Sequence, residues 1–495
     1  MRLPAFTLDH PRSFTKSPFV IKFAILISML TSIAIAGFGQ TYKVVYTFPA
    51  TDAPYSNLVQ GLDGNLYGTT QSGGAHGKGT VYKLTPGGTL TTIYSFCSLA
   101  NCADGAGPSS LILGSNGNFY GTTGGGGTGA VGCGAGCGTL FKLTPKGILT
   151  TLHNFCSAAP CEDGAQPYTA LVEGTDANFY GTTPTTPRNG GSSYDGAVYR
   201  ITPTGAFTTL YSFCPQGNCG DGGGPISALT QGTNGQFYGV TSAGGANGLG
   251  GIFEIASNGT LSLRYSFDGL QNSTFYSQLL QANNGNFYGM MQYGGTNGCD
   301  YNYQCGALYE MTPSGGLSTL VNFDGSDGSD PLGGFVQGGN GDLYGLTMTG
   351  GANDGGIIFK MTPSGTLATL HDFCAINCTN GYYPSFGIYQ ATNGLFYGIA
   401  YSGEQGATIV FSFSTGLKPF VDTLPTSGKV GTKVTILGNN LTGSTAVAFN
   451  GTPAAFTVVS STEIATTVPA GATSGKVEVT TPTGMLSTTI KFRVP

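Results

Sequence analysis

The sequence predicts an all-β protein built from many short strands and tight turns. Of its 495 residues, 84 are glycine and only 9% are charged, a composition unsuited to long helices. The 26 Tyr and 30 Phe supply the apolar surface that a sizeable core needs. The third observation is a three-residue element that recurs at a nearly fixed period along most of the chain.

This element consists of an aromatic residue or leucine, then Tyr, then Gly. Its tyrosines lie 53, 60, 58, 50, 56 and 53 residues apart, a period that suits a four-stranded propeller blade rather than a helical repeat. The copies are Leu66-Tyr67-Gly68, Phe119-Tyr120-Gly121, Phe179-Tyr180-Gly181, Phe237-Tyr238-Gly239, Phe287-Tyr288-Gly289, Leu343-Tyr344-Gly345 and Phe396-Tyr397-Gly398. The sequence therefore predicts a seven-bladed β-propeller, and we expect the repeated tyrosines to pack between blades.

Each repeat contains four segments with strand character. In the second copy they are Ser109 to Leu113, Asn118 to Thr123, Thr139 to Thr144 and Ile148 to Phe155. An Asn-Gly or Asp-Gly pair separates the first two segments in most copies and predicts a two-residue hairpin with positive φ angles. The third copy departs from this pattern with Asp176-Ala177.

The two ends of the repeat region predict how the propeller closes. After the seventh element one strand remains, Ala407 to Phe413, and a fourth strand is missing. Near the N-terminus, Tyr42 to Phe48 matches the pattern of fourth strands such as Thr91 to Phe96. We expect this N-terminal strand to complete the last blade and to remove the exposed sheet edges, so that residues 41–417 form a closed propeller.

The strand order also assigns the loops to two faces. The turns between first and second strands, and between third and fourth strands, lie on one face. The loops between second and third strands and the blade-to-blade connections lie on the other, which we call the long-loop face. Long, variable loops carry function more often than tight turns do, so we expect binding on the long-loop face.

The twelve cysteines form six pairs that are close in sequence. An even number of cysteines in an exported chain favours disulfides, and irregular spacing with few histidines disfavours the alternative of zinc. The pairs are Cys97/Cys102, Cys133/Cys137, Cys156/Cys161, Cys214/Cys219, Cys299/Cys305 and Cys374/Cys378. All six map to the long-loop face, and pairing between neighbouring loops remains open.

The N-terminus has the layout of a secretory signal in residues 1–36. Arg2, Arg12, Lys16 and Lys22 precede an apolar run from Phe23 to Ala36. An uncleaved anchor is the alternative, but the run is shorter than the ~20 residues that a transmembrane helix needs. We therefore expect an exported protein that is extracellular, at the cell surface or periplasmic, with no membrane span after removal of the signal.

Charge limits the partners that the protein can have. The net charge is −5 and becomes −8 without the signal segment, and no basic cluster is present. Both features disfavour binding to nucleic acid. A glycan or a surface protein is the expected partner, and we expect a monomer.

Two sets of residues are candidates for binding. Asp104, Asp163, Asp221 and Asp327 each precede a glycine in a blade connection, where carboxylates could hold calcium or sugar hydroxyls. The simpler interpretation is that Asp and Gly are the residues that such turns need. The second set is Tyr301, Tyr303, Tyr382 and Tyr383, placed in long loops beside cysteines, where they could stack on a sugar or anchor a protein.

No catalytic constellation emerges from the sequence. His153 and His371 occupy fourth-strand positions where Tyr94 and Tyr211 stand in other copies, so they are repeat variants. The neighbouring carboxylates Glu162 and Asp163 give no evidence of the separation that sugar chemistry requires. We predict no catalytic residue, cofactor or metal. A binding protein is favoured, and a polysaccharide lyase or hydrolase on a propeller scaffold is the alternative.

The C-terminal region changes character at about Lys418. Short alternating strands, the last of them Thr488 to Val494, predict a small β-sandwich. The segments Gly438-Asn439-Asn440-Leu441 and Phe449-Asn450-Gly451 resemble the immunoglobulin-like IPT/TIG family across residues 418–495.

The repeats themselves also resemble a known family. Asp63-Gly64-Asn65-Leu66-Tyr67-Gly68-Thr69-Thr70, with Gly79-Thr80-Val81-Tyr82-Lys83-Leu84-Thr85-Pro86, is similar to the bacterial GloVer tandem repeat of exported "choice-of-anchor" proteins, over residues 41–417. The resemblance implies export and a repeat fold, and it supplies no catalytic residues.

Overall fold

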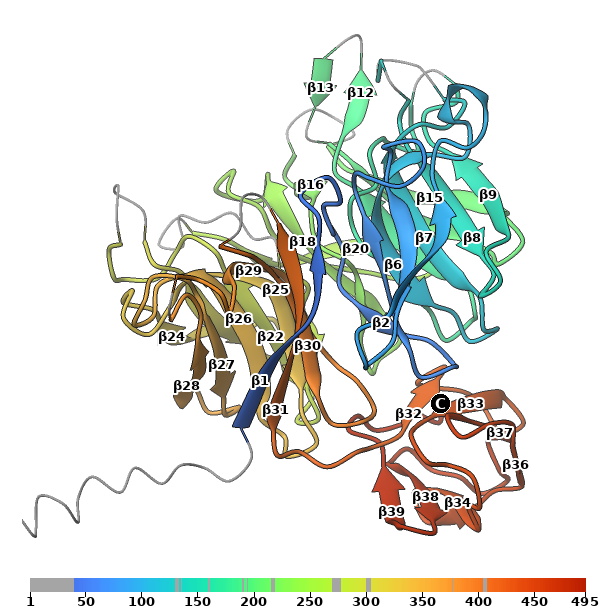
Figure 1. The fold of residues 1–495 in the computed structure, drawn as a ribbon. Coiled ribbons are helices and arrows are strands. Elements are labelled where there is room, and N and C mark those ends of the chain that lie inside the picture. Colours follow the sequence, from blue (N-terminus) through green and yellow to red (C-terminus); the bar gives the residue numbers. More distant parts are fainter. Residues whose placement is uncertain are drawn as a thin grey trace, which may run out of the picture. The chain divides into compact units, whose positions relative to one another are not determined.

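The computed structural model describes residues 40–495 apart from 130–132, 135, 159–160, 189–190, 194, 215–218, 269–276, 300–303, 376 and 404–406. The predicted signal segment, residues 1–36, lies outside the described residues. Regular structure in the described part consists of strands and one 3₁₀ turn, η1 (Ala100–Cys102), which confirms the all-β prediction (Figure 1). None of the helical structure described has the length and apolar character that crossing a bilayer requires.

The chain from Gln40 to Thr415 forms a succession of small antiparallel sheets, in sequence order. The first is β2 (Val59–Gln60), β3 (Leu66–Thr70), β4 (Thr80–Leu84) and β5 (Leu90–Ser95); the second is β6 (Ala106–Leu113), β7 (Phe119–Gly125), β8 (Thr139–Leu143) and β9 (Leu149–Asn154). The third is β10 (Val172–Glu173), β11 (Phe179–Thr183), β14 (Ala197–Ile201) and β15 (Phe207–Ser212), with a separate hairpin of β12 (Thr186–Arg188) and β13 (Gly191–Ser193).

The succession continues with the same topology. The next sheets are β16 (Gly223–Pro225), β17 (Thr230–Gln231), β18 (Phe237–Ala243), β19 (Gly251–Ile255) and β20 (Leu261–Ser266), followed by β21 (Leu280–Gln281), β22 (Phe287–Met291), β23 (Ala307–Met311) and β24 (Leu317–Asn322). Then come β25 (Ser329–Gln337), β26 (Leu343–Thr349), β27 (Ile357–Met361) and β28 (Leu367–Asp372), and finally β29 (Tyr382–Gln390), β30 (Phe396–Tyr401), β31 (Thr408–Thr415) and β1 (Gln40–Phe48).

The N-terminal strand joins the last of these sheets. β1 lies beside β31 and supplies the fourth strand that the seventh repeat lacks, as the sequence predicts (Figure 1). The ring of Tyr42 stacks on His371, with centroids 4.2 Å apart, and its hydroxyl donates to the carbonyl of Asn380 at 2.6 Å. Strand β1 is therefore held by side-chain contacts as well as by its ladder.

The repeated tyrosines pack between neighbouring sheets, which confirms the expectation. Tyr120 stacks on Phe179 of the following sheet at 3.9 Å, and Tyr180 stacks on Phe237 at 4.0 Å. In this way the tyrosine of one element covers the first aromatic residue of the next. Where the next element begins with leucine, as at Leu343 and Leu66, the tyrosine and the leucine share one buried cluster. Such aromatic pairs add about 0.5–1.5 kcal/mol beyond the area they bury.

The glycine of each element makes room for an aromatic side chain on the third strand. Gly121 pairs with Phe141, and a Cβ atom at Gly121 would lie 2.5 Å from the Phe141 ring. The same pairing places Tyr82 opposite Gly68 and Tyr199 opposite Gly181. The element therefore couples two contacts: the tyrosine packs on the next sheet, and the glycine admits the ring of its own sheet.

The tight turns differ from the predicted two-residue hairpins. In the first repeat the loop runs from Gly61 to Asn65, where Gly64 N donates to Gly61 O at 3.0 Å and Gly61 N donates to Asn65 O at 2.8 Å. Only Gly64 has a positive φ, 76°, so the preceding Asp63 has a different role. Its carboxylate accepts a 3.0 Å hydrogen bond from the Tyr67 hydroxyl, which ties the turn to the repeated tyrosine.

The third repeat forms the same turn without a glycine at the left-handed position. Ala177 adopts the left-handed conformation, with φ 62°, and its N–H donates to Gly174 O at 2.9 Å. Asp176 accepts a 2.8 Å hydrogen bond from the Tyr180 hydroxyl. The tyrosine anchor and the adjoining ladder therefore hold a conformation that costs about 1 kcal/mol for a residue with a Cβ atom.

The C-terminal residues form two sheets around one core. One sheet contains β32 (Asp422–Leu424), β33 (Lys433–Leu437), β37 (Glu463–Thr467) and β36 (Phe456–Val458); the other contains β35 (Thr452–Pro453), β34 (Ala446–Phe449), β38 (Val477–Thr481) and β39 (Gly484–Ser487). The predicted last strand, Thr488 to Val494, is wrong, because this segment makes isolated bridges to three different partners and belongs to no continuous ladder. The edge strand forms earlier, at β39.

Candidate binding site

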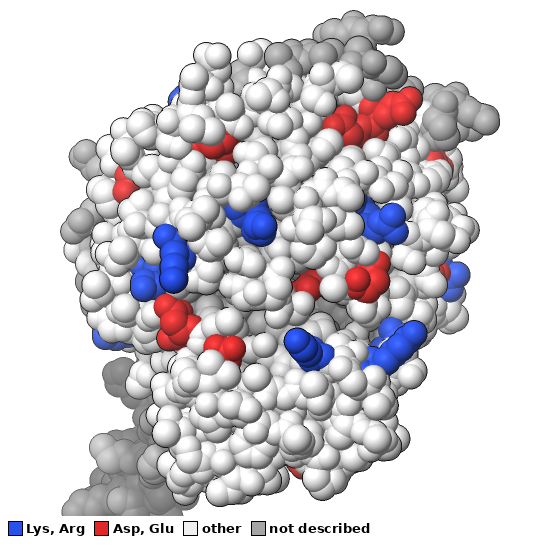
Figure 2. Space-filling view, turned by 90° about the vertical axis from the view of Figure 1, so that its right-hand side faces the viewer, with Lys and Arg blue, Asp and Glu red and all other residues white. Residues whose placement is uncertain are grey.

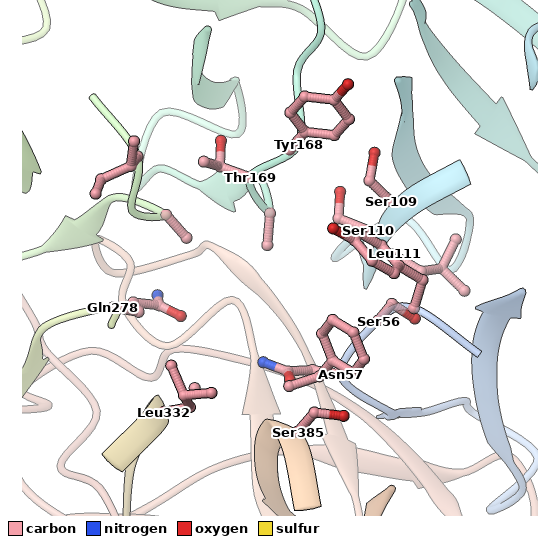
Figure 3. A pocket seen from close by; sticks show the side chains of 16 residues that line it. Ser56, Asn57, Ser109, Ser110, Leu111, Tyr168, Thr169, Gln278, Leu332 and Ser385 are labelled. Carbon is pink, nitrogen blue, oxygen red and sulfur yellow. The ribbon is translucent and has the colours of Figure 1, made fainter. Parts of the chain in front are cut away.

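A cavity of about 400 Å³ lies where the innermost segments of the repeat sheets meet. Every sheet contributes to its wall from its first strand or the residues just before that strand (Figure 3). The contributing residues include Tyr55, Ser110, Tyr168, Ala228, Gln278, Leu332 and Ser385. Cavities of this size hold small-molecule ligands in other proteins.

The cavity lies toward the long-loop face. Tyr168 follows a blade connection, and its ring packs on Gly124, which is at the long-loop end of β7. A Cβ atom at Gly124 would lie only 2.5 Å from Cε1 of Tyr168. The Tyr168 side chain is nevertheless 41% exposed, so it is accessible at the mouth of the cavity.

The described residues that line this cavity carry no charged side chain. Their polar groups are hydroxyls and amides, and their apolar groups include Leu111, Ile226 and Leu332. Partial burial and the neighbouring Tyr55 raise the pKa of Tyr168 above its ordinary value, so its hydroxyl stays protonated at neutral pH. The wall is electrically neutral across the physiological range.

Several hydroxyls of the wall are engaged in holding the sheets together. Ser56 Oγ accepts the N–H of Thr69 at 3.0 Å, and Ser110 Oγ lies 2.9 Å from Oγ1 of Thr122. Thr169 makes the equivalent contact with Thr182 at 2.9 Å. These side chains join the first strand to the second at positions where the backbone ladder is short, so they shape the wall and have little capacity left for a ligand.

The last sheet turns an aromatic side chain into the cavity wall. The pairing of β29 with β30 shifts register on both sides of Ser385, and the next residue, Phe386, has φ 67°. The Phe386 ring lies 4.8 Å from that of Tyr55. A non-glycine residue with positive φ at a β-bulge is strained, and bulges of this kind often re-aim a side chain at a functional site.

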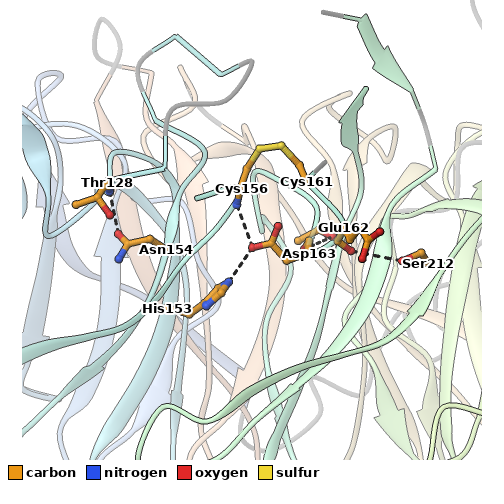
Figure 4. A network of polar contacts seen from close by, with 9 residues as sticks. Thr128, His153, Asn154, Cys156, Cys161, Glu162, Asp163 and Ser212 are labelled. Atoms are coloured by element: carbon orange, nitrogen blue, oxygen red, sulfur yellow. Dashed lines mark hydrogen bonds and ion pairs between the residues drawn. A yellow bond between two sulfur atoms is a disulfide. The ribbon is translucent and has the colours of Figure 1, made fainter. Parts of the chain in front are cut away.

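Three of the predicted aspartates accept hydrogen bonds from residues of their own repeat. Asp163 accepts hydrogen bonds from His153 Nε2 at 2.8 Å and from Cys156 N at 3.0 Å (Figure 4). Tyr94 and Tyr211 donate in the same way to Asp104 at 2.8 Å and to Asp221 at 2.6 Å. The histidine at 153 therefore substitutes for a tyrosine that clamps the blade connection, as the repeat pattern indicates.

The surroundings of Asp104 illustrate how fully such a carboxylate is engaged. Besides the Tyr94 hydroxyl, it accepts the N–H and hydroxyl of Ser98, both at 2.9 Å, and the N–H of Leu99 at 3.2 Å. Burial acts to raise the pKa of Asp104, but these hydrogen bonds outweigh burial and leave the pKa below its ordinary value.

Asp327 lies in a different environment. Asp324 N donates to its Oδ1 at 2.8 Å, within a compact turn. Burial and the charge of Asp324 raise the pKa of Asp327. None of the four predicted aspartates lines the cavity.

The predicted tyrosines divide into two pairs. Tyr301 and Tyr303 lie outside the described residues. Tyr382 and Tyr383 were expected in a loop, but they begin strand β29, because the turn after Cys378 is short and pairing with β30 starts at once, Tyr382 opposite Tyr401. The rings of Tyr382 and Tyr383 lie 4.8 Å apart, outside the cavity, in a group with Tyr401 of which Tyr383 and Tyr401 are exposed.

All twelve cysteines form disulfides in the predicted local pairs. The bonds are Cys97–Cys102, Cys133–Cys137, Cys156–Cys161, Cys214–Cys219, Cys299–Cys305 and Cys374–Cys378. Four close the ends of blade connections and two lie between second and third strands. Disulfides of this number are typical of proteins that mature in an oxidising compartment.

Comparison with known sequences identifies the repeats. The Gloeobacter/Verrucomicrobia repeat matches residues 31–220, 185–300 and 300–436, which together cover most of the chain. The chain belongs to the Gloeobacter/Verrucomicrobia repeat family. Residues 419–494 of this family member match the IPT/TIG domain. No curated protein matches its sequence.

Solved structures share the fold of this Gloeobacter/Verrucomicrobia repeat protein. A streptogramin B lyase is similar with a TM-score of 0.50 and 16% identity, over 77% of this chain and 99% of that one. A virginiamycin B lyase from Staphylococcus aureus is similar with a TM-score of 0.50 and 14% identity, over 76% of this chain and 99% of that one. At such low identity the likeness concerns the propeller-like fold alone.

Sequence reasoning missed the cavity residues of this repeat protein, although the chain carries a signal for them. A proline stands near the start of most repeats, and the residue after it lines the cavity. These residues are Tyr55, Ser109, Tyr168, Ile226, Leu332 and Ser385. The sequence pattern favoured the aspartate before the proline instead, because a carboxylate is a common ligand for metals and sugars. The position after the proline varies from Tyr to Leu, so its residue types indicate no particular ligand.

Proposed function

We propose that the protein is an exported binding protein in which a closed, seven-bladed propeller holds a ligand at its axis, on the long-loop face. One observation carries the proposal: a neutral cavity to which the inner segment of every repeat sheet contributes. Concave sites with an apolar wall and a few convergent polar groups are the usual place for a ligand.

Packing between the sheets supports closure into seven blades. Each repeat sheet shares one buried cluster with the next, from the cluster of Tyr67 and Phe119 to that of Tyr344 and Phe396. A further cluster contains Tyr397 of the last sheet and Leu66 of the first. A chain of sheets whose last member packs on its first is a ring, and closure protects the edges of the sheets.

The proposed domain limits follow from this ring. Residues 1–36 form a cleaved signal, residues 41–417 the propeller and residues 418–495 the immunoglobulin-like module. The six disulfides support an exported chain. We place the protein outside the cytoplasm as a monomer, with the terminal module as a spacer or docking unit.

The chemistry of the cavity favours binding over turnover. A polysaccharide lyase or hydrolase needs groups that transfer protons, usually carboxylates or histidine. Among the described residues of the wall, tyrosine is the only titratable side chain, and partial burial raises the pKa of Tyr168 still further above neutral. We therefore do not transfer the activity of the lyases that share the fold to this chain.

A glycan or a surface protein suits this site better than nucleic acid. On the face drawn in Figure 2 the charged side chains stand singly or in small groups among uncharged ones, without a large continuous basic area. Phosphate-backbone binding depends on such an area.

A binding screen with a cavity-filling variant tests the proposal. The mature chain is applied to glycan and surface-protein arrays and incubated with a panel of polysaccharides. Ala228→Phe places a ring in the cavity, whereas Ile148→Phe adds a ring at a side chain that is 64% exposed on the tight-turn face. We expect binding that Ala228→Phe abolishes and Ile148→Phe retains. Reproducible turnover that a single carboxylate substitution abolishes would favour the enzyme and overturn the proposal.

A further inference from the structure

The proposed function leaves the ligand class open, and the chemistry of the cavity wall limits which classes of ligand can bind. Every described lining residue is uncharged, so a charged ligand would lose its hydration without gaining an opposite charge. Leaving an ion without a partner in a partly buried site costs several kcal/mol. The cavity therefore selects against phosphorylated, sulfated and uronic acid ligands.

Aromatic side chains from three repeat sheets line the cavity. Tyr168 comes from the third sheet, while the pair of Tyr55 and Phe386 comes from the first and last sheets. Tyrosine presents a flat apolar face together with a polar hydroxyl, so it suits ligands that have both an apolar face and polar groups. The strained backbone at Phe386 indicates that the position of this ring is selected at a cost in stability.

A few polar groups of the wall remain free for a ligand. No hydrogen bond within the described chain engages the Asn57 amide, the Ser385 hydroxyl or the Tyr168 hydroxyl. In Figure 3 Tyr168 is seen on the side of the cavity opposite Asn57 and Ser385. An amide and two hydroxyls offer donors and acceptors together, and a ligand with hydroxyl groups can satisfy both.

We propose that this cavity binds one uncharged sugar residue of a glycan, with the C–H face of the pyranose ring against Tyr168 and its hydroxyls toward Asn57 and Ser385. A neutral pyranose has the required combination of no charge, one apolar face and a rim of hydroxyls. Its size is compatible with a cavity of about 400 Å³. The inference rests on the proposed binding function and assigns its ligand class.

Gly124 has a positioning role in this arrangement. It lies under the Tyr168 ring and is not itself part of the wall. Its φ is not in the left-handed region, so alanine is compatible with the backbone, but the new Cβ would overlap the ring. Gly124→Ala therefore moves Tyr168 without replacing any residue of the cavity wall.

The test uses calorimetric titration and saturation-transfer NMR on the full mature chain. The probes are neutral oligosaccharides of glucose, galactose and mannose, an oligogalacturonate of equal length, and an uncharged aromatic glycoside with its sugar-free aglycone. The variants are Tyr168→Ala, Gly124→Ala and Asn57→Ala. Tyr401→Ala is the matched control, because Tyr401 is 42% exposed and lies outside the cavity. Thermal unfolding confirms that each variant is folded.

We expect at least one neutral oligosaccharide to bind and the oligogalacturonate to bind at least tenfold more weakly. Tyr168→Ala and Gly124→Ala should each weaken binding by about tenfold or more, a change of about 1.4 kcal/mol. Asn57→Ala should weaken it several-fold, and Tyr401→Ala should leave it unchanged. Ring and anomeric protons on one face of the sugar should show the strongest saturation transfer.

Other outcomes separate this inference from the proposed function. Sugar binding that only Tyr401→Ala weakens would overturn the cavity assignment and leave a glycan-binding protein. Equal binding of the aglycone alone, or preference for oligogalacturonate, would overturn the sugar class. Binding only to surface proteins would also overturn the sugar class while preserving the binding function, and absence of all binding would overturn both.

Discussion

Oε1 of Gln60 accepts a 2.9 Å hydrogen bond from the backbone N–H of Thr392, 332 residues away. Gln60 ends the first strand of the first repeat sheet, and Thr392 lies in the first turn of the last sheet. Gln60 is only 3% exposed, so this bond is buried at the junction of the first and last repeat sheets.

The bond belongs to a pattern that recurs between sheets. Gln231, Gln281 and Gln337 accept the N–H of Thr175, Thr233 and Asn283 at 3.1, 2.7 and 2.9 Å, each in the preceding sheet. The amide nitrogens of the same glutamines donate to the glycine of their own turn, as Gln60 Nε2 does to Gly64 O at 3.3 Å. One side chain therefore holds its own turn and the neighbouring sheet.

Gln60→Leu should destabilise the ring at its closing junction. The substitution leaves the N–H of Thr392 without a partner, which costs about 1–3 kcal/mol for a buried group. We expect a lower midpoint in calorimetric unfolding. Gln390→Leu is the matched control, because Gln390 is buried at the equivalent position and its Oε1 has no partner in the described chain. Equal losses from both variants would contradict a specific role for the Gln60 bond.

Glu173→Gln should stabilise the protein at neutral pH. Glu173 occupies a glutamine position of the pattern and accepts the N–H of Ser115 at 2.7 Å. Burial raises its pKa above the ordinary value, despite the hydrogen bonds from Ser115. The folded state therefore binds the proton more tightly than the unfolded state, and stability falls as pH rises from about 4.5 through the folded pKa.

Glutamine removes that penalty and keeps an acceptor for the Ser115 N–H. The variant should unfold at a higher temperature than the wild type at pH 8 and at nearly the same temperature at pH 4. A pH-independent difference between the two proteins would show that the charge of Glu173 is not responsible. Gln281→Glu is the converse variant and should introduce the same pH dependence.

Tyr82→Phe and Tyr199→Phe should each stabilise the propeller. Both hydroxyls are buried and have no hydrogen-bond partner in the described chain. Other repeats carry Phe141, Phe253, Phe359 and Phe411 at this position, opposite the repeated glycine. Leaving a polar group unpaired costs about 1–3 kcal/mol, so its removal should raise the unfolding midpoint.

Tyr120→Phe serves as the control for these variants. Its hydroxyl accepts a 2.8 Å hydrogen bond from the Asn116 side chain at the tight turn. Loss of this bond should cost about 0.5–1.5 kcal/mol. The prediction fails if all three substitutions change the unfolding midpoint in the same direction.

The hydrogen bonds that Asp104, Asp163 and Asp221 accept should stabilise the fold without calcium. Asp104→Ala should lower the unfolding midpoint by removing the acceptor for Tyr94, Ser98 and Leu99, at a cost of about 1–3 kcal/mol. Neither EDTA nor added calcium should shift the midpoint of the wild type. A rise of several degrees with calcium that Asp104→Ala abolishes would instead support a metal site.

The repeat pattern in the sequence predicted the strands and their packing because these depend on short-range regularities. The spacing of the tyrosines placed the sheets. The two cysteines of each disulfide are four to six positions apart in the sequence, so their pairing followed from proximity. The missing fourth strand after Phe413 indicated that an N-terminal strand would fill its place. The predicted turn geometry was wrong because it considered only the backbone angles of the turn residues. In the structure the aspartate of the turn accepts a hydrogen bond from the hydroxyl of the repeated tyrosine.

The amino-acid sequence by itself determined the repeat, the all-β fold and the disulfides, since each depends on contacts within one repeat or between adjacent repeats. It also determined the terminal module, through short motifs such as Gly438-Asn439-Asn440-Leu441. Only the tertiary structure decided where the candidate site lies. Tyr55, Tyr168 and Phe386 come from different repeats, and none of them occupies a position that stays constant from repeat to repeat. They meet because every sheet turns its first strand inward, a relation that arises only when all the sheets are assembled around a common centre.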